Sequence, residues 1–121
     1  MAKTALVTGA SSGIGREIAR DLSARGFRVI ISARREERLR ELAKELGDNT
    51  RVIVCDVSDR EECLRLYEET KNEKISVLVN CAGFGAVGSF DELPLDTELK
   101  MIDTNVTAVH MLTKLFLKDF V

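Results

Sequence analysis

A glycine-rich turn near the amino terminus has the residue types and the spacing of a loop that binds phosphate. Residues 8–15 read Thr-Gly-Ala-Ser-Ser-Gly-Ile-Gly. Glycines let the backbone approach an anion closely, and the free amides and positive dipole end of a helix receive its charge. The glycine spacing (Gly9, Gly13, Gly15) differs from G-x-G-x-x-G, and the turn lacks the lysine of a P-loop. The turn favours a phosphate cradle; an ordinary tight turn between a strand and a helix is the alternative.

The segments on either side of this turn supply a strand before it and a helix after it. An apolar run at residues 5–7 precedes the turn. The segment that follows has one apolar face, made by Ile14, Ile18, Ala19 and Leu22. A strand, a glycine turn and the start of a helix therefore fall together, which is the arrangement that phosphate binding at a helix N-terminus needs.

Arg34 is a second candidate, at the end of the second predicted strand. Nucleotide-binding folds that begin with a strand, a glycine turn and a helix choose between cofactors at this place. An Asp or Glu there accepts hydrogen bonds from the ribose hydroxyls of NAD and repels a 2′-phosphate. Residues 32–35 read Ser-Ala-Arg-Arg, with no acid. Arg34 can instead present a planar fork to a phosphate, which favours NADP. The alternative is a basic start to a surface helix, with Glu36 and Glu37 partly offsetting its charge.

Further polar residues follow the later strands. Asp56 and Val57 come after the third strand, where a carboxylate can accept a hydrogen bond from an adenine amino group, although Asp is also a common turn residue. Asn80 follows the fourth strand, and its amide is expected to bridge neighbouring strand ends. Asn105 lies within a predicted helix, which an asparagine disfavours unless it bonds water or backbone at a site. A solvated surface asparagine is the alternative.

Apolar runs alternate with helical patterns along the chain. The predicted strands are 4–8, 28–32, 51–55 and 75–79; the predicted helices are about 13–25, 35–46, from Ser58 or Asp59 to about Lys71, and from about 95–97 to the end. Strands that are apolar throughout and joined by helices indicate parallel pairing with both faces covered. Right-handed crossovers then give an α/β fold with a Rossmann-like, doubly wound parallel sheet of order 3-2-1-4. Ligands of such sheets bind beyond the carboxyl ends of the strands.

The composition indicates one soluble domain, residues 1–121, with 31% charged residues and a net charge of −2. This gives no electrostatic case for nucleic acid or an anionic membrane, and no run approaches the roughly 18 apolar residues of a membrane span. Cys55, Cys63 and Cys81 lack CxxC spacing, so we expect reduced thiols of a cytoplasmic protein with no assigned reactivity. Because a strand is predicted from residue 4, we expect no secretory signal at the start. His110, the single histidine, excludes most histidine-rich metal sites and is expected to pack in the core or at a helix interface.

Four motifs occur in a set order: Thr8-Gly9-x-x-x-Gly13-x-Gly15, Asp56-Val57, Asn80-x-Ala82-Gly83 and Asn105. With them the chain resembles the short-chain dehydrogenase/reductase family over its whole length. The resemblance implies a Rossmann domain that binds NAD(P) and moves a hydride between nicotinamide and a carbonyl or alcohol carbon. Asn105 would match the catalytic asparagine, which supports a proton-relay water. The implied cofactor contacts are Gly9, Ser11, Ser12, Ile14 and Gly15 at the pyrophosphate, with Gly13 in the same turn; Asp56 and Val57 at the adenine; and Asn80, Ala82 and Gly83 near the nicotinamide-side ribose.

The family's serine on a fifth strand and its Tyr-x-x-x-Lys pair on the next long helix do not occur in these 121 residues. Tyr67 and Lys71 match Tyr-x-x-x-Lys literally, but they precede Asn80 instead of following Asn105. Tyr67 is therefore expected to half-bury its ring against the sheet. An unpaired fourth strand and a partly uncovered last helix predict either self-association or continuation in a longer reductase.

These observations predict the cofactor-binding half of an NADP-dependent oxidoreductase, inactive alone, whose intact form acts on a small carbonyl or alcohol substrate. We expect a homo-oligomer formed through the last helix, without nucleic-acid or membrane partners and without a metal. A non-catalytic nucleotide-binding or interaction module is the second hypothesis. An NAD-preferring enzyme is the third.

Overall fold

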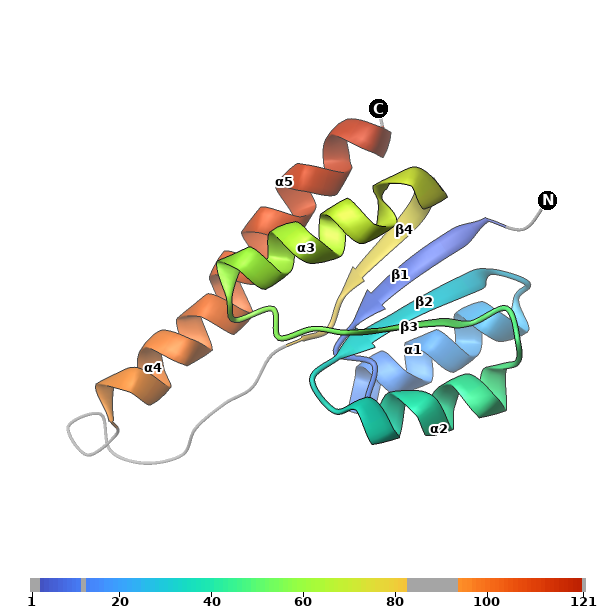
Figure 1. Cartoon of the computed structure of the whole chain (residues 1–121), viewed down its shortest axis with the longest axis horizontal. Coiled ribbons are helices and arrows are strands. Elements are labelled where there is room, and N and C mark those ends of the chain that lie inside the picture. Colours follow the sequence, from blue (N-terminus) through green and yellow to red (C-terminus); the bar gives the residue numbers. More distant parts are fainter. Residues whose placement is uncertain (1–2, 12, 83–93, 121) are drawn as a thin grey trace.

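The computed structural model of this chain describes residues 3–11, 13–82 and 94–120. Within these ranges, strands and helices alternate along the chain (Figure 1). The strands are β1 (Thr4–Thr8), β2 (Arg28–Ala33), β3 (Arg51–Val54) and β4 (Ile75–Asn80). The helices are α1 (Gly13–Ala24), α2 (Glu36–Leu46), α3 (Arg60–Thr70), α4 (Leu95–Ile102) and α5 (Ala108–Phe120), with a 3-10 turn η1 (Lys71–Glu73) and a π-helical turn η2 (Asp103–Thr107).

The strands form one parallel sheet in the order β3-β2-β1-β4. The helices α1 and α2 cover one face of the sheet, and α3 and α5 cover the other (Figure 1). The predicted fold class and strand order are therefore confirmed. Because β2 and β4 both lie beside β1, the direction of winding reverses there, and the carboxyl end of β1 is the switch point at which open α/β sheets bind ligands.

The register places the carboxyl ends of the strands side by side. Thr8, the last residue of β1, pairs with Ser32 of β2 and with Asn80 of β4. Ser32 pairs in turn with Ile53 of β3. Aligned partners in neighbouring strands point to the same face of a sheet. The segments that follow all four strands consequently meet at one edge.

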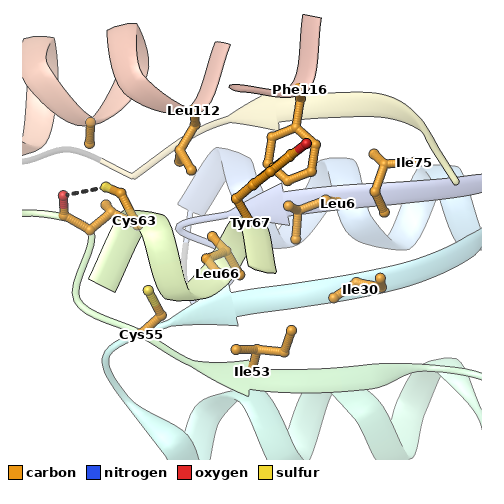
Figure 2. Packing of buried hydrophobic residues seen from close by; sticks show 12 residues of the cluster. Leu6, Ile30, Ile53, Cys55, Cys63, Leu66, Tyr67, Ile75, Leu112 and Phe116 are labelled. Carbon is orange, nitrogen blue, oxygen red and sulfur yellow. Dashed lines mark hydrogen bonds between the residues drawn. The ribbon is translucent and has the colours of Figure 1, made fainter. Parts of the chain in front are cut away.

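Apolar side chains fill both faces of the sheet. Leu6 and Ile30 pack with α3 and α5, including Phe116, in the cluster of Figure 2. Val7 and Ile31, the next residues in each strand, are buried on the opposite face with α1 and α2. Successive side chains alternate between faces that are both covered, so the strands are apolar throughout, as a parallel sheet requires.

The ends of the elements follow local signals in the sequence. All four strands end within one residue of the predicted positions. Asp59 caps α3: its carboxylate accepts a hydrogen bond of 2.9 Å from the backbone N–H of Glu61. This satisfies one of the donors that a helix N-terminus leaves free. The α3 helix ends at Thr70, and the 3-10 turn η1 contains Lys71.

The last helix is not the single regular helix predicted from the sequence. It is α4 followed by the π-helical turn η2 and then α5. The backbone N–H of Ala108 donates to the carbonyl of Asp103, five residues earlier, which widens the helix locally. Asn105, the residue that a regular helix disfavours, lies inside this turn. The mid-helix asparagine thus marked a real irregularity that the pattern of apolar residues did not indicate.

Two side chains that could take part in a reaction, Tyr67 and His110, lie where neither lines the cavity between the strand ends. Tyr67 is 7% exposed, and its hydroxyl donates to a carboxylate oxygen of Asp119 at 3.1 Å. Its ring meets that of Phe116 edge-on, with centroids 5.1 Å apart, as Figure 2 shows. The burial predicted for Tyr67 is confirmed, and it is more complete than expected. His110 is exposed, so the prediction that it packs in the core is wrong.

Candidate functional site

A cavity of about 380 Å³ opens at the carboxyl ends of β1, β2 and β3. It lies at the switch point of the sheet, where the sequence motifs were expected to converge. Eight of the predicted site residues line it: Gly9, Ser11, Ile14, Gly15, Arg34, Asp56, Val57 and Ala82. The other lining residues are Thr8, Ser32, Ala33, Arg35, Cys55, Cys81 and Thr104.

Two glycines of the first turn are required by close packing. A Cβ on Gly9 would lie 2.5 Å from the backbone carbonyl carbon and oxygen of Cys81. A Cβ on Gly15 would clash with the carbonyl of Gly9. The absence of these two side chains lets the first turn, the start of α1 and the end of β4 pack together.

Gly13 has a different reason to be glycine. Its φ is +58°, in the left-handed region that favours glycine, but a Cβ there would meet no atom within 4 Å. Gly13 begins α1, and the first turn of this helix contains no acidic residue. The helix therefore presents its positive end and free amides without a competing carboxylate, which suits an anion. Ile14 is 74% exposed beside this end.

Thr8 joins the ends of β1 and β4, a role the sequence had suggested for Asn80. The Thr8 hydroxyl accepts hydrogen bonds from the backbone N–H groups of Cys81 (3.2 Å) and Ala82 (3.3 Å), and it lies 3.4 Å from the Val79 carbonyl, to which it donates. The Asn80 amide instead donates to the Thr113 hydroxyl of α5 at 3.3 Å. The predicted bridge by Asn80 is therefore wrong, because its side chain faces α5.

Arginine and aspartate side chains line the cavity beyond β2 and β3. Arg34 and Arg35 are both exposed there. Burial alone would raise the pKa of Asp56, but two hydrogen bonds from Ser58 and the charges of Arg34 and Lys100 outweigh it and lower that pKa below its usual value. The Asp56 carboxylate accepts from the Ser58 hydroxyl at 2.7 Å and from its backbone N–H at 3.0 Å. Asp56 is thus held ionised and oriented at the rim.

Several predicted site residues lie outside the cavity wall. Among the described residues, Gly13, Asn80 and Asn105 do not line it, although Thr104, the neighbour of Asn105 in η2, does. Asn105 has an exposed side chain. Ser12 and Gly83 fall outside the ranges that the structure describes.

The structure adds residues to the site that sequence reasoning missed. Arg35 was visible in the sequence beside Arg34, and Thr8 stood in the glycine motif without a role. Ser32 and Thr104 are both buried and carried no local signal. A residue at a strand end or in a helix turn is recognised as part of a wall only once its neighbours are known.

The three cysteines are free and offer no activated thiol. Burial raises the pKa of Cys55 to about 12 and that of Cys63 to about 11. Burial also raises the pKa of Cys81. The thiols of Cys55 and Cys63 donate to the backbone carbonyls of Glu62 and Val57. All three remain protonated near neutral pH, so none is a nucleophile in this state.

A doubly wound sheet with a glycine turn, a helix N-terminus and basic residues at its switch point defines a nucleotide-binding α/β protein. The chain matches the model of the short chain dehydrogenase family over residues 3–121, and it belongs to this family. It is 39% identical over 119 residues to a 3-oxoacyl-(acyl-carrier-protein) reductase of Rickettsia prowazekii, a match that covers 98% of this chain and 48% of the relative. It is 41% identical over 110 residues to an uncharacterized oxidoreductase of Staphylococcus saprophyticus, covering 86% and 47%.

Solved structures share the fold. An actinorhodin polyketide ketoreductase crystallised with NADPH matches with a TM-score of 0.89 and 41% identity, covering 98% of this chain and 48% of that one. A serine dehydrogenase complexed with NADP+ matches with a TM-score of 0.88 and 34% identity, covering 98% and 49%. The chain thus spans about half the length of the relatives it matches. In the described part of the chain, no helix has the length and apolar character needed to cross a membrane.

Proposed function

We propose that the whole protein is an NADP-dependent oxidoreductase acting between a carbonyl and an alcohol, and that this chain is its cofactor-binding half. The residues at the end of β2 favour NADP over NAD. Arg34 and Arg35 line the cavity there, and residues 32–35 contain no acid. A guanidinium there suits a 2′-phosphate, which a carboxylate would repel. The similarity to structures with NADPH and with NADP+ also supports this choice.

The residues present fit such a cofactor. The Gly9 and Gly13 turn and the acid-free start of α1 would hold the pyrophosphate through backbone amides. Asp56, kept ionised by its surroundings, would accept a hydrogen bond from the adenine amino group, with Val57 at the ring edge. Ala82, whose backbone is tied to Thr8, would lie near the nicotinamide-side ribose together with Asn80 and Gly83.

When bound, the nicotinamide ring would supply or accept the hydride. The chain's own part is to hold the cofactor and to place Asn105 in the π-helical turn beside the cavity-lining Thr104, a position that suits the ordering of a proton-relay water. Tyr67 is not a candidate proton donor, because it is buried between α3 and α5 and bonded to Asp119. The relatives' names cite different substrates, including 3-oxoacyl groups and serine; their common chemistry is a carbonyl or alcohol carbon.

Calorimetric titration with NADPH, NADH and ADP tests the choice of cofactor. We expect NADPH to bind more tightly than NADH, and Arg34→Ala to weaken NADPH binding by at least about tenfold, because a charge-assisted hydrogen bond to phosphate contributes about 1.5–3 kcal/mol. NADH binding should change little. Added salt should weaken NADPH binding more than NADH binding, since the contact is ionic.

Arg25→Ala is the matched control, since it removes an exposed arginine of the same charge that pairs with Asp21 away from the cavity. It should leave the affinities for both cofactors unchanged. Equal weakening by both variants would mean that net charge, and no specific contact, favours NADPH. NADH binding at least as tightly as NADPH would support an NAD-preferring enzyme instead.

A chain that binds none of these nucleotides would favour the non-catalytic interaction module. Turnover of a panel of carbonyl substrates by the isolated chain, abolished by Tyr67→Phe, would overturn the proposal that the chain is inactive alone.

Support for a cytoplasmic location comes from the free thiols of Cys55, Cys63 and Cys81, which suit a reducing compartment.

We also propose that copies of the chain associate through the last helix. Leu95, Leu99 and Ile102 follow one another at helical spacing along α4 and are 68%, 48% and 52% exposed. An apolar face of this kind favours a partner. We expect size-exclusion chromatography with light scattering to show a dimer or larger species that Leu99→Glu reduces to a monomer. Leu64→Glu, at an exposed position of α3, is the control; a monomeric wild-type chain would contradict the proposal.

A further inference from the structure

The hydroxyl of Ser32 is a buried polar group at the cavity that the structure leaves unpaired. Ser32 is 1% exposed, and it lines the cavity between Thr8 and Arg34. Its Oγ has no hydrogen-bond partner within the described part of the chain. Buried side-chain hydroxyls nearly always have one, so this atom calls for an explanation.

The backbone holds this serine firmly at the carboxyl edge of the sheet. Its carbonyl accepts a hydrogen bond of 3.2 Å from the backbone N–H of Ala10, in the glycine turn. Its strand register with Thr8 and with Ile53 fixes the face to which its side chain points. That face is the one covered by α3 and α5, because Ile53 and Leu6, two residues before Thr8, pack there.

The hydroxyl of Thr8, on the same face of the sheet, has the hydrogen-bond partners that the Ser32 hydroxyl lacks. Thr8 Oγ1 lies between β1 and β4 and makes three contacts with backbone groups of residues 79–82. The position of Ser32, between Thr8 and Ile53 in the sheet, offers no such partner in the described chain. An unpaired buried hydroxyl lowers the stability of the unliganded protein, and a ligand that pairs with it recovers that cost on binding.

We propose that the Ser32 hydroxyl binds the adenosine half of the cofactor, through a ribose hydroxyl or a ring nitrogen, directly or by way of one water. The proposal rests on the proposed nucleotide-binding function. Ser32 lies in the same wall as Arg34, Asp56 and Val57, the residues assigned to that half. It is a binding residue that positions the nucleotide, and it exchanges no proton or bond with the substrate.

The test compares the wild-type chain with Ser32→Ala, Ser32→Cys and the control Ser76→Ala, an exposed serine of β4. Affinities for ADP and NADPH are measured by calorimetry, and melting temperatures are measured without ligand. We expect Ser32→Ala to weaken both ligands about five- to tenfold, as the loss of one ligand hydrogen bond does, while its unliganded melting temperature stays equal or rises. Ser32→Cys keeps the shape of the side chain with a somewhat larger atom and provides only a weak donor, so it should bind like Ser32→Ala.

Each other outcome overturns the inference in a recognisable way. A lower melting temperature with unchanged affinities would mean that Ser32 has a structural role only. Wild-type affinity in Ser32→Cys would mean that the position fills space. Weaker NADPH binding with unchanged ADP binding would place the contact at a group that ADP lacks, either the 2′-phosphate or the nicotinamide half, and not at a ribose hydroxyl or ring nitrogen of the adenosine. A wild-type chain that binds neither ADP nor NADPH would overturn the proposed function itself, whereas the first three results leave it standing.

Discussion

Gly9→Ala is expected to destabilise the chain by about 2–5 kcal/mol and to abolish nucleotide binding. The new Cβ would lie 2.5 Å from the carbonyl carbon and oxygen of Cys81 and 2.6 Å from the backbone nitrogen of Ala82. These are backbone atoms, so no side chain can rotate away, and the first turn must separate from the end of β4. Overpacking of this kind costs about 1–3 kcal/mol, and left-handed backbone adds about 1–2 kcal/mol for a residue with a Cβ.

Gly13→Ala is the matched control for this change. Gly9 and Gly13 have φ values of +64° and +58°, so alanine pays nearly the same backbone strain at both positions. A Cβ at Gly13 meets no atom within 4 Å, so only that strain of about 1–2 kcal/mol remains. Thermal unfolding should therefore separate the two variants by several degrees. Equal melting temperatures would show that the close approach of the first turn to Cys81 does not limit stability.

Phe116→Ala is expected to cost about 3–5 kcal/mol, the range for removing a large buried aromatic side chain. Phe116 is 1% exposed and lies in the cluster between the sheet, α3 and α5 (Figure 2). Its ring meets Tyr67 at 5.1 Å and an interplanar angle of 78°, a favoured edge-on arrangement. Chemical denaturation should show a lower midpoint, because the loss leaves a cavity under α5.

Two variants identify the source of that loss. Leu117→Ala changes the next residue of α5, which is 52% exposed, and should alter stability by less than about 0.5 kcal/mol. Tyr67→Phe removes only the hydroxyl that donates to Asp119, at a cost of about 1 kcal/mol. A larger loss in Leu117→Ala than in Phe116→Ala would contradict the assignment of Phe116 to the core. If the Tyr67 hydroxyl had a catalytic role, Tyr67→Phe would abolish activity and leave the stability of the chain unchanged.

The sequence predicted best the site residues whose place depends on the local backbone conformation or on where a strand ends. Gly9 and Gly15 were predicted to shape the first turn, and the structure shows the close contacts that require them. Arg34 and Asp56 were placed beyond their strands because apolar runs stop just before them, and both line the cavity. These signals depend on neighbours within a few residues, which a sequence displays directly.

The predictions that failed concern side chains whose surroundings depend on how the segments pack together. Asn80 was expected to bridge strand ends, but Thr8 bonds to the backbone of Cys81, 73 residues away. His110 was expected in the core or at a helix interface because apolar residues flank it. The buried face of α5 is Ala108, Leu112 and Phe116, at a spacing of four residues, and His110 lies between two of these positions on the exposed side of the helix.

The sequence by itself determined the alternation of strands and helices, the parallel sheet and the glycine turn, since periodicity, caps and glycine spacing are local properties of the chain. Tertiary structure alone decided which hydroxyls meet partners. Thr8 and Ser32 are both short polar residues at the ends of buried strands, and the sequence does not distinguish them. In the folded chain Thr8 lies beside the backbone N–H groups that follow β4, whereas the hydroxyl of Ser32, a residue that lines the cavity, is buried with no partner in the described residues. The difference arises from strand order, because only a strand paired with β4 can reach those donors.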